Sequence, residues 1–167
     1  MKNSSRIKCL IFILFTLLVY STHIWSMPGY AELSSDGTLW FWSGQKPSEE
    51  NCYDVEDTKG NPGWDCSKIK RVVFNSSFRS VFPKSTKRWF YNAVNLKEIS
   101  GWVNLETMQV KDMESMFEGC SSLESVDLSF FSSYETTNMA SMFSGCSKIK
   151  GAVQFFRGCP PVTTIRI

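Results

Sequence analysis

Histidine is almost missing from this sequence. Among 167 residues there is one, His23, and it lies in an amino-terminal segment that looks like a leader. Histidine is the usual general base of serine and cysteine hydrolases and a ligand of most zinc sites. A hydrolase without it would need a pair of carboxylates, and no spacing of Asp and Glu singles out such a pair. We therefore expect a protein that is not an enzyme, with no catalytic residue, no cofactor and no metal site.

Apolar stretches long enough to cross a bilayer are also missing. The run Cys9–Tyr20 offers about a dozen strongly apolar residues, whereas a membrane-spanning helix needs roughly 20. It follows a basic segment with three Lys or Arg in the first eight residues, which is the layout of a secretory signal. We predict a signal peptide over residues 1–31, cleaved after Ala31, with Ser26 as a second cleavage point. An uncleaved anchor helix is the alternative.

Charge of one sign is not in excess either. The leader contains three of the 18 basic residues and none of the 16 acidic ones, so 15 basic residues remain against 16 acidic ones. Proteins that bind nucleic acid usually carry an excess of basic residues, and this chain has none after the leader is removed. We expect a secreted or cell-surface (envelope) protein that contacts a membrane only through its signal segment.

Residues 32–85 are rich in Trp, Phe, Gly, Pro and charge, and they show no clear period. Turn residues flank two β-prone runs, Thr38–Trp42 and Ile69–Phe74, which we predict to be strands. Cys52 and Cys66 lie between these runs, and export to an oxidising compartment would allow a disulfide between them, with two free thiols as the alternative. We interpret this region as an amino-terminal cap that contains β-structure.

Residues 86–150 are internally repetitive. The segment Asp112–Leu123 recurs as Asn138–Ile149 at an offset of 26 residues, and a degenerate earlier copy, Trp89–Leu96, aligns with Met116–Leu123 at an offset of 27. Units of this size cannot bury an apolar face by themselves and must stack on their neighbours. The repeats therefore predict a stacked array with one continuous core.

Each repeat is predicted to contain a short helix and a short strand. Met113, Met116 and Phe117 have the i, i+3, i+4 spacing of one helix face, Gly119 suits the end of that helix, and Leu123–Ser129 alternates like a strand. The expected fold class is α/β: a short leucine-rich-repeat-like solenoid of parallel strands plus short helices, next to the β-containing cap. The predicted repeat core consists of Phe90, Leu96, Met113, Met116, Phe117, Cys120, Leu123, Val126, Leu128, Met139, Met142, Phe143, Cys146 and Ile149.

The repeat motif resembles a known family. The pattern MxxMFxGCSSL over residues 113–123, which returns as MxxMFxGCS from Met139, resembles the repeats of BspA-like leucine-rich-repeat bacterial surface proteins. The resemblance covers residues 86–150 and implies a secreted or surface protein that presents a repetitive face for adhesion to host matrix proteins, host cells or other microbes. Residues 151–167 depart from the pattern and form an atypical tail.

Binding is the expected function, and a protein of the host matrix or cell surface is the expected partner. A glycan is the second candidate, because Trp40, Trp42 and Trp64 could serve as stacking platforms for sugars; packing of these rings in the core is the alternative. A truncated repeat protein without independent activity is the third candidate, since the tail lacks the polar capping repeat that such arrays normally need.

Overall fold

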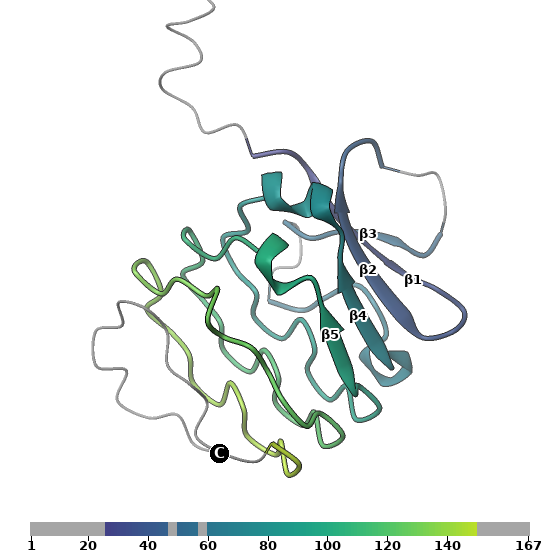
Figure 1. Cartoon of the computed structure of the whole chain (residues 1–167), viewed down its shortest axis with the longest axis vertical. Helices are drawn as coiled ribbons and strands as arrows, with labels where there is room; N and C mark the ends of the chain where they lie inside the picture. Colours follow the sequence, from purple (N-terminus) through teal and green to yellow (C-terminus); the bar gives the residue numbers. More distant parts are fainter. Residues whose placement is uncertain (1–25, 47–49, 57–59, 150–167) are drawn as a thin grey trace, which may run out of the picture.

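The computed structural model describes residues 26–46, 50–56 and 60–149. Five strands form one mixed sheet in the order β3-β1-β2-β4-β5, in which β1 is antiparallel to β2 and β3, and β4 is parallel to β2 and β5. Figure 1 shows the sheet on the right and the repeats as successive turns of chain, coloured green to yellow, on the left. The strands are β1 (Gly29–Leu33), β2 (Thr38–Ser43), β3 (Cys52–Asp54), β4 (Arg71–Phe74) and β5 (Glu98–Ser100), and the short 3₁₀ helices are η1 (Cys66–Lys68), η2 (Ser76–Ser80) and η3 (Trp102–Asn104).

The β1–β2 hairpin is formed by local chemistry at its turn. The Asp36 carboxylate accepts hydrogen bonds from the Thr38 main-chain N–H (2.9 Å) and from the Thr38 hydroxyl (3.0 Å), as expected of an Asx-turn. Gly37 has a φ of 87°, and a Cβ there would meet the main-chain oxygen of Lys68 at 2.7 Å. Only glycine fits this turn, which brings β1 alongside β2.

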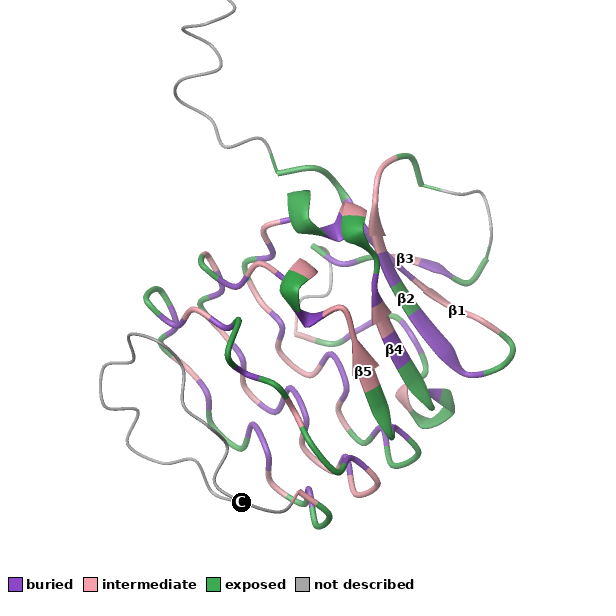
Figure 2. Cartoon of the chain, in the orientation of Figure 1, coloured by how far each residue is buried: buried purple, intermediate pink, exposed green. Residues whose placement is uncertain are grey.

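The strand predicted at Thr38–Trp42 is present as β2, and the one predicted at Ile69–Phe74 is present as β4. In β2, Leu39 and Phe41 are fully buried while Trp40 between them is 40% exposed, which is the alternation of a strand with one face on the core. Figure 2 colours the buried residues of β2 purple and its exposed residue green.

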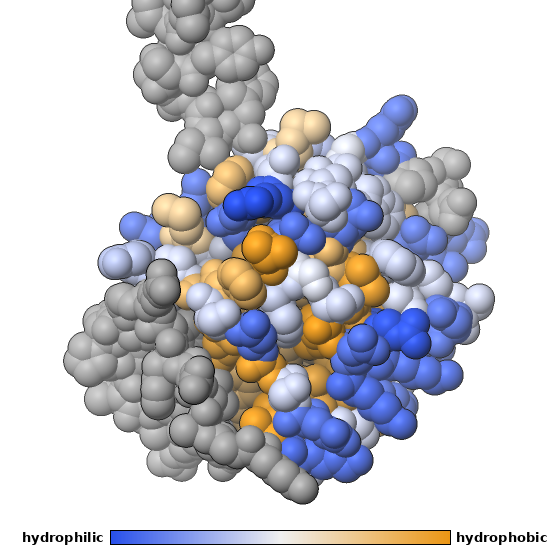
Figure 3. Space-filling model, in the orientation of Figure 1, coloured by the Kyte–Doolittle hydropathy of each residue, from blue (hydrophilic) through white to orange (hydrophobic). Residues whose placement is uncertain are grey.

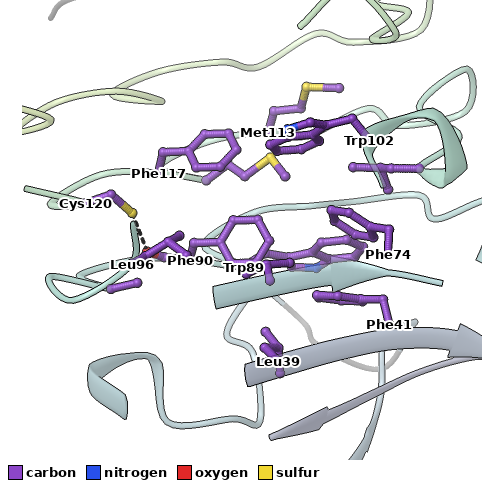
Figure 4. Close-up of a cluster of buried hydrophobic side chains, with 14 of the residues drawn as sticks. Leu39, Phe41, Phe74, Trp89, Phe90, Leu96, Trp102, Met113, Phe117 and Cys120 are labelled. Atoms are coloured by element: carbon purple, nitrogen blue, oxygen red, sulfur yellow. Dashed lines mark hydrogen bonds between the residues drawn. The ribbon is translucent and has the colours of Figure 1, made fainter. Parts of the chain in front are cut away.

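One hydrophobic core joins the sheet to the repeats. Phe41 of β2 stacks on Trp89 of the first repeat, with ring centroids 5.0 Å apart. Phe90 stacks on Phe117 at 5.4 Å, and Phe117 stacks on Phe143 at 5.2 Å with planes only 3° apart. Figure 4 shows how the rings of the sheet and of the first two repeats meet in this core.

The prediction of an α/β solenoid of parallel strands plus short helices is wrong. The described residues form a mixed sheet of five strands, and they contain 3₁₀ helices but no α-helix. The apolar spacing at Met113, Met116 and Phe117 belongs to a chain of turns instead of a helix.

Left-handed residues explain why no helix forms in the repeats. Ser115 has a φ of 56°, and Arg88 and Ser141, at the equivalent positions of the other repeats, have φ values of 57° and 56°. An α-helix cannot pass through such a residue. The Cys120 N–H still bonds three residues back to Phe117 (3.0 Å), but the Phe117 N–H bonds to Met142 of the next repeat (2.9 Å). Along the repeat, main-chain N–H groups therefore donate alternately to a carbonyl of the same turn and to a carbonyl of the next repeat.

The strand predicted over Leu123–Ser129 is also not formed. Within the described ranges, the main-chain N–H groups of residues 124–127 make no backbone bond to a neighbouring repeat. Asp127 instead accepts a bond from the Ser129 N–H (2.9 Å), a local turn that competes with strand pairing. Among the described residues, β5 is therefore the last strand of the sheet, and the repeats are joined by isolated parallel bridges between Ser85 and Asp112 and between Asp112 and Asn138.

Candidate binding surface

The residues predicted as the repeat core lie together in the interior. Val126 and Ile149 are half-buried and pack against the core, and all the others are buried. The two cysteines of the repeats occupy equivalent places: Cys120 donates from Sγ to the main-chain oxygen of Phe90 (3.1 Å), and Cys146 donates to that of Phe117 (3.0 Å). Each thiol thus ties its repeat to the preceding one.

The possible disulfide between Cys52 and Cys66 is not formed. Cys66 is a free thiol that donates a hydrogen bond from Sγ to the main-chain oxygen of Trp89 (3.5 Å). Burial, and then the negative charge of Asp65, raise the pKa of Cys66 to about 12. Cys52 is buried in β3.

An aromatic and charged surface covers the side of the sheet that faces away from the core, and we call it the outer sheet face. Its central row runs across four strands through residues paired directly with one another, Glu32, Trp40, Val73 and Ser100. Paired residues share a face, and strands are about 4.8 Å apart, so the row extends for about 14 Å. Trp40 is the large exposed apolar side chain in it.

Charged and aromatic rows border this central row. On one side Arg71 pairs with Glu98 in the sheet, and their side chains form an exposed ion pair of 3.6 Å. On the other side Tyr30 pairs with Trp42, with ring centroids 6.3 Å apart. Trp42 is half-buried and Tyr30 is buried, so they support the surface more than they project from it.

The three tryptophans considered as stacking platforms have different environments. Trp40 is exposed and Trp42 is half-buried. Trp64 is buried, packs edge-on against Phe41 at 5.6 Å, and donates from Nε1 to the main-chain oxygen of Trp89 (2.8 Å). Trp64 therefore belongs to the core and is excluded as a platform.

Lys87, Glu114 and Asn138, one from each repeat, form a polar ladder that links the repeats. These residues were not predicted from the sequence. Lys87 Nζ lies 2.9 Å from Glu114 Oε2, and Asn138 Nδ2 donates to the same oxygen (2.8 Å). These two hydrogen bonds hold the pKa of Glu114 below its ordinary value. The ladder is visible in the sequence only after the repeats are aligned, because its members lie 24 to 27 residues apart.

A polar hollow of about 380 Å³ lies beside this ladder. Its lining includes Lys84, Lys87, Glu56 and Asp112. The Lys87 ammonium lies 3.9 Å from the Asp112 carboxylate, so charge of either sign is largely compensated within the wall. The hollow therefore favours neither an anion nor a cation.

Other exposed apolar side chains lie outside the sheet: Val103 in η3, and Met108, Phe130 and Tyr134 on loops. On the side seen in Figure 3, apolar residues gather near the centre and hydrophilic ones occupy the lower right. Within the described ranges, no three His, Cys, Asp or Glu residues gather as metal ligands, and no helix has the length and hydrophobicity of a membrane span. Among the described residues, the outer sheet face thus combines an exposed aromatic side chain with charged neighbours on paired strands.

Comparison with known proteins gives a family and no individual relative. No curated protein and no solved structure matches the chain significantly. Residues 62–158, more than half of the chain, match the family described as "Mycoplasma protein of unknown function, DUF285". This stretch contains β4, β5 and all the aligned repeats. The chain belongs to the DUF285 family.

Proposed function

We propose that this protein is a secreted or cell-surface binding module that contacts a protein of the host matrix or host cell surface through its outer sheet face. The supporting observation is the placement of Trp40 on a flat, strand-built surface with Glu32, Arg71 and Glu98 around it. Tryptophan and arginine are the residues most enriched at energetic centres of protein interfaces. DUF285 is related to the BspA-like surface repeat families, which supports the same assignment.

The rigidity of the surface also favours binding. The inward side chains of the same strands, Leu39, Phe41 and Val72, are fully buried, so the backbone below Trp40 is fixed before any partner arrives. A preorganised surface loses less conformational freedom on association. Affinity can then come from few exposed side chains.

The test compares binding of the purified protein to immobilised fibronectin, fibrinogen and whole host cells. We expect saturable binding to at least one of them, and a loss of about tenfold or more in affinity for Trp40→Ser, as for an interface centre. Tyr134→Ser is the matched control, because Tyr134 is an aromatic residue, 73% exposed, on a loop outside the sheet. No saturable binding, or equal effects of the two variants, would refute the proposal.

A glycan is the second candidate partner, and the half-buried Trp42 on the same face as the exposed Trp40 favours it. Rings on one face of a strand two residues apart are separated by about 7 Å and can stack on successive sugars. Quenching of tryptophan fluorescence by soluble glycans, lost in Trp40→Ser, would identify this class. Quenching unchanged in that variant would exclude the outer sheet face as the glycan site.

The proposed export requires a cleavage point that leaves the sheet intact. Ala31, the favoured point in the sequence analysis, is fully buried in β1, which pairs with β2 on one side and β3 on the other. Cleavage there would remove Gly29–Ala31 from an inner strand. We therefore propose cleavage after Ser26, which keeps β1 whole and retains the bond from the Met27 N–H to the Ser80 oxygen (2.9 Å).

Two shortened chains test this choice. The chain that begins at Met27 is expected to unfold cooperatively, and the one that begins at Glu32 to lack a cooperative transition, because it loses most of β1. Amino-terminal sequencing of the exported protein gives the site directly. A folded chain that begins at Glu32, or a natural terminus at Glu32, would show that β1 is dispensable. Cooperative unfolding of the longer chain would also argue against a truncated protein without independent function.

A further inference from the structure

A second hollow lies at the turn end of the β1–β2 hairpin, and we call it the hairpin hollow. It has a volume of about 360 Å³, and its wall combines the end of β1 and the hairpin turn with β3, η1 and the first repeat. The wall includes Ser34, Asn51, Tyr53, Asp65, Lys70 and Asn95. Ligand sites have volumes of about 300–1,000 Å³, so this hollow has room for one small molecule or for one unit of a larger one.

The hairpin hollow lies on the inner side of the sheet, away from the outer sheet face. Tyr53 pairs in the sheet with Ala31, which is fully buried, and paired residues point to the same face. The Tyr53 ring packs edge-on against the buried Trp64, with ring centroids 6.1 Å apart. The hollow and Trp40 are therefore separate sites on opposite sides of the sheet.

Hydrogen bonds between the segments fix the wall of the hollow. The Gly37 carbonyl of the hairpin turn accepts a bond from the Lys70 N–H (2.8 Å), and Asn95 Nδ2 donates to the main-chain oxygen of Ser67 (3.0 Å). The Asp65 carboxylate accepts bonds from the main-chain N–H (3.1 Å) and the hydroxyl (2.6 Å) of Ser67. The hairpin, η1 and the first repeat are thus joined to one another, and a preformed wall loses little conformational freedom when it binds a ligand.

The wall of the hollow has one positive charge in excess. Its charged residues are Asp65, Lys68 and Lys70, and Lys68 Nζ lies 3.2 Å from Asp65 Oδ2. Hydrogen bonds from Ser67 hold the pKa of Asp65 below its ordinary value, so this carboxylate stays charged and compensates Lys68. Among the described residues, Lys70 has no ion-pair partner. Its ammonium group is therefore available to a negatively charged ligand group, unlike that of Lys87 in the hollow beside the ladder.

Uncharged polar groups make up most of the remaining wall. They are three serine hydroxyls and two side-chain amides, from Ser34, Ser35, Ser67, Asn51 and Asn95. The Asp65 carboxylate repels a bare anion, but it accepts hydrogen bonds from hydroxyl groups. The half-buried ring of Tyr53 adds an apolar surface. The wall therefore matches a ligand that has several hydroxyls, an apolar ring face and one negative charge.

We propose that the hairpin hollow binds a carboxylated monosaccharide unit, which is a sugar ring with several hydroxyl groups and one carboxylate. Lys70 pairs with the sugar carboxylate, the amides of Asn51 and Asn95 bond to hydroxyls, and the sugar ring packs against Tyr53. A hydrogen bond from a charged donor is roughly twice as strong as a neutral one, so Lys70 selects acidic sugars over neutral ones. A sialic acid at the end of a glycan and a uronic acid in a polysaccharide share this chemistry.

Nuclear magnetic resonance titration of the purified protein tests the proposal, with N-acetylneuraminic acid and glucuronic acid as separate probes. We expect at least one acid to shift the side-chain amide signals of Asn51 and Asn95 in a saturable way, and to leave the indole N–H signal of Trp40 unchanged. Glucose, which has no carboxylate, should bind more weakly. Binding of one acid alone would identify the source of the sugar, and binding of both would support the shared chemistry.

Three variants locate the site. Lys70→Gln should weaken binding about tenfold or more, as expected for the loss of a hydrogen bond from a charged group. Lys97→Gln is the matched control, because Lys97 is also an exposed lysine but is not among the residues that line the hollow. Ser35→Glu places a second carboxylate at an exposed position of the wall and should weaken binding by a similar factor. It provides a second test if Lys70→Gln does not fold.

Three outcomes would overturn the proposal. They are the absence of saturable shifts with either acid, equal effects of Lys70→Gln and Lys97→Gln, and shifts of the same size and affinity with inorganic phosphate, because charge alone would then explain binding. Trp40→Ser should leave the titration unchanged, since Trp40 lies on the other side of the sheet. A failure of the hairpin hollow is therefore distinguishable from a failure of the outer sheet face.

Discussion

Replacement of Phe117 by alanine tests the packing that connects the repeats to the sheet. Its buried ring lies between Phe90 (5.4 Å) and Phe143 (5.2 Å), and a third ring, Trp102 of η3, meets it edge-on at 6.1 Å. The main chain of Phe117 is bonded to Met142, so the neighbouring turns cannot easily collapse into the space left by the ring. The substitution should leave a cavity.

The expected loss in the free energy of unfolding is at the upper end of the range for replacing a core phenylalanine by alanine. Removing a buried Phe side chain costs about 3–5 kcal/mol, and each stacked aromatic pair contributes about 0.5–1.5 kcal/mol beyond its buried area. Two stacked pairs are lost here, so we expect a loss of about 5 kcal/mol. Whole domains are stable by only about 5–15 kcal/mol, and Phe117→Ala should therefore be close to unfolded at room temperature.

Urea unfolding followed by tryptophan fluorescence measures the loss. Phe130→Ala is the matched control, because Phe130 is 51% exposed, and it should cost less than about 0.5 kcal/mol. Phe117→Leu should fall between the two variants, since it fills part of the space. If Phe117→Ala and Phe130→Ala differ by less than about 1 kcal/mol, a core cavity does not form and the stacking argument is wrong.

Two further predictions concern backbone conformation and thiol ionisation. Gly145→Ala should destabilise the fold by about 1–2 kcal/mol through its left-handed φ alone, since its Cβ would meet Gly119 at an ordinary 3.5 Å. Gly119→Ala should destabilise it clearly more, because its Cβ would lie 2.2 Å from Asn92 Oδ1. Equal losses of stability in urea unfolding would contradict this order. Burial raises the pKa of Cys66 from the ordinary 9.0 of a thiol to about 12. The folded state therefore holds this proton more tightly than the unfolded state, and the free energy of unfolding should fall as pH rises from about 9 toward 12. Cys66→Ser should reduce that slope, and equal slopes would refute the shift.

The sequence was sufficient to predict β2 and β4 because their cues are local. In each strand a short run with alternating burial ends at turn residues, and no distant contact is needed to recognise it. β1 was missed for an equally local reason. The small residues Gly29 and Ala31 match the pattern of a signal peptidase site, and the same residues are small because they lie in an inner strand, where a Cβ on Gly29 would meet Val81 at 2.6 Å.

The error in the repeats came from apolar spacing, which does not specify backbone conformation. Met113, Met116 and Phe117 point inward from a helix or from a chain of turns alike, since both return to the same side every three to four residues. The left-handed conformation of Ser115 distinguishes the chain of turns from a helix. Serine rarely adopts this conformation, so its presence in the sequence does not predict it. Comparison of the repeats gave one hint: Asn92 stands where Gly119 and Gly145 stand, and all three have positive φ.

The candidate binding surface could be predicted only in part. Trp40 was named as a platform, but its neighbours Val73 and Ser100 come from strands that lie 33 and 60 residues further along the chain, and only the register of the sheet brings them together. Trp64 has the same side chain and comparable local surroundings in the sequence. Its burial depends on contacts with Phe41 and Trp89, which no local pattern encodes.

The alternating hydrogen bonds run in one direction: these N–H groups of the first and second repeats donate to carbonyls of the repeat that follows. About half of the amides in a repeat close its own turns, and the others require acceptors in the next repeat, so an isolated repeat would leave polar groups unpaired at a cost of about 1–3 kcal/mol each if buried. The first repeat is covered by the sheet, where Trp89 stacks on Phe41 and accepts a bond from Trp64. The first repeat meets the sheet through Trp89 and the second repeat through Phe90 and its alternate amides. Among the described residues, each of its two sides is therefore satisfied by a different kind of neighbour, and substitutions at Trp89 and at Phe117 should uncover different sides of it.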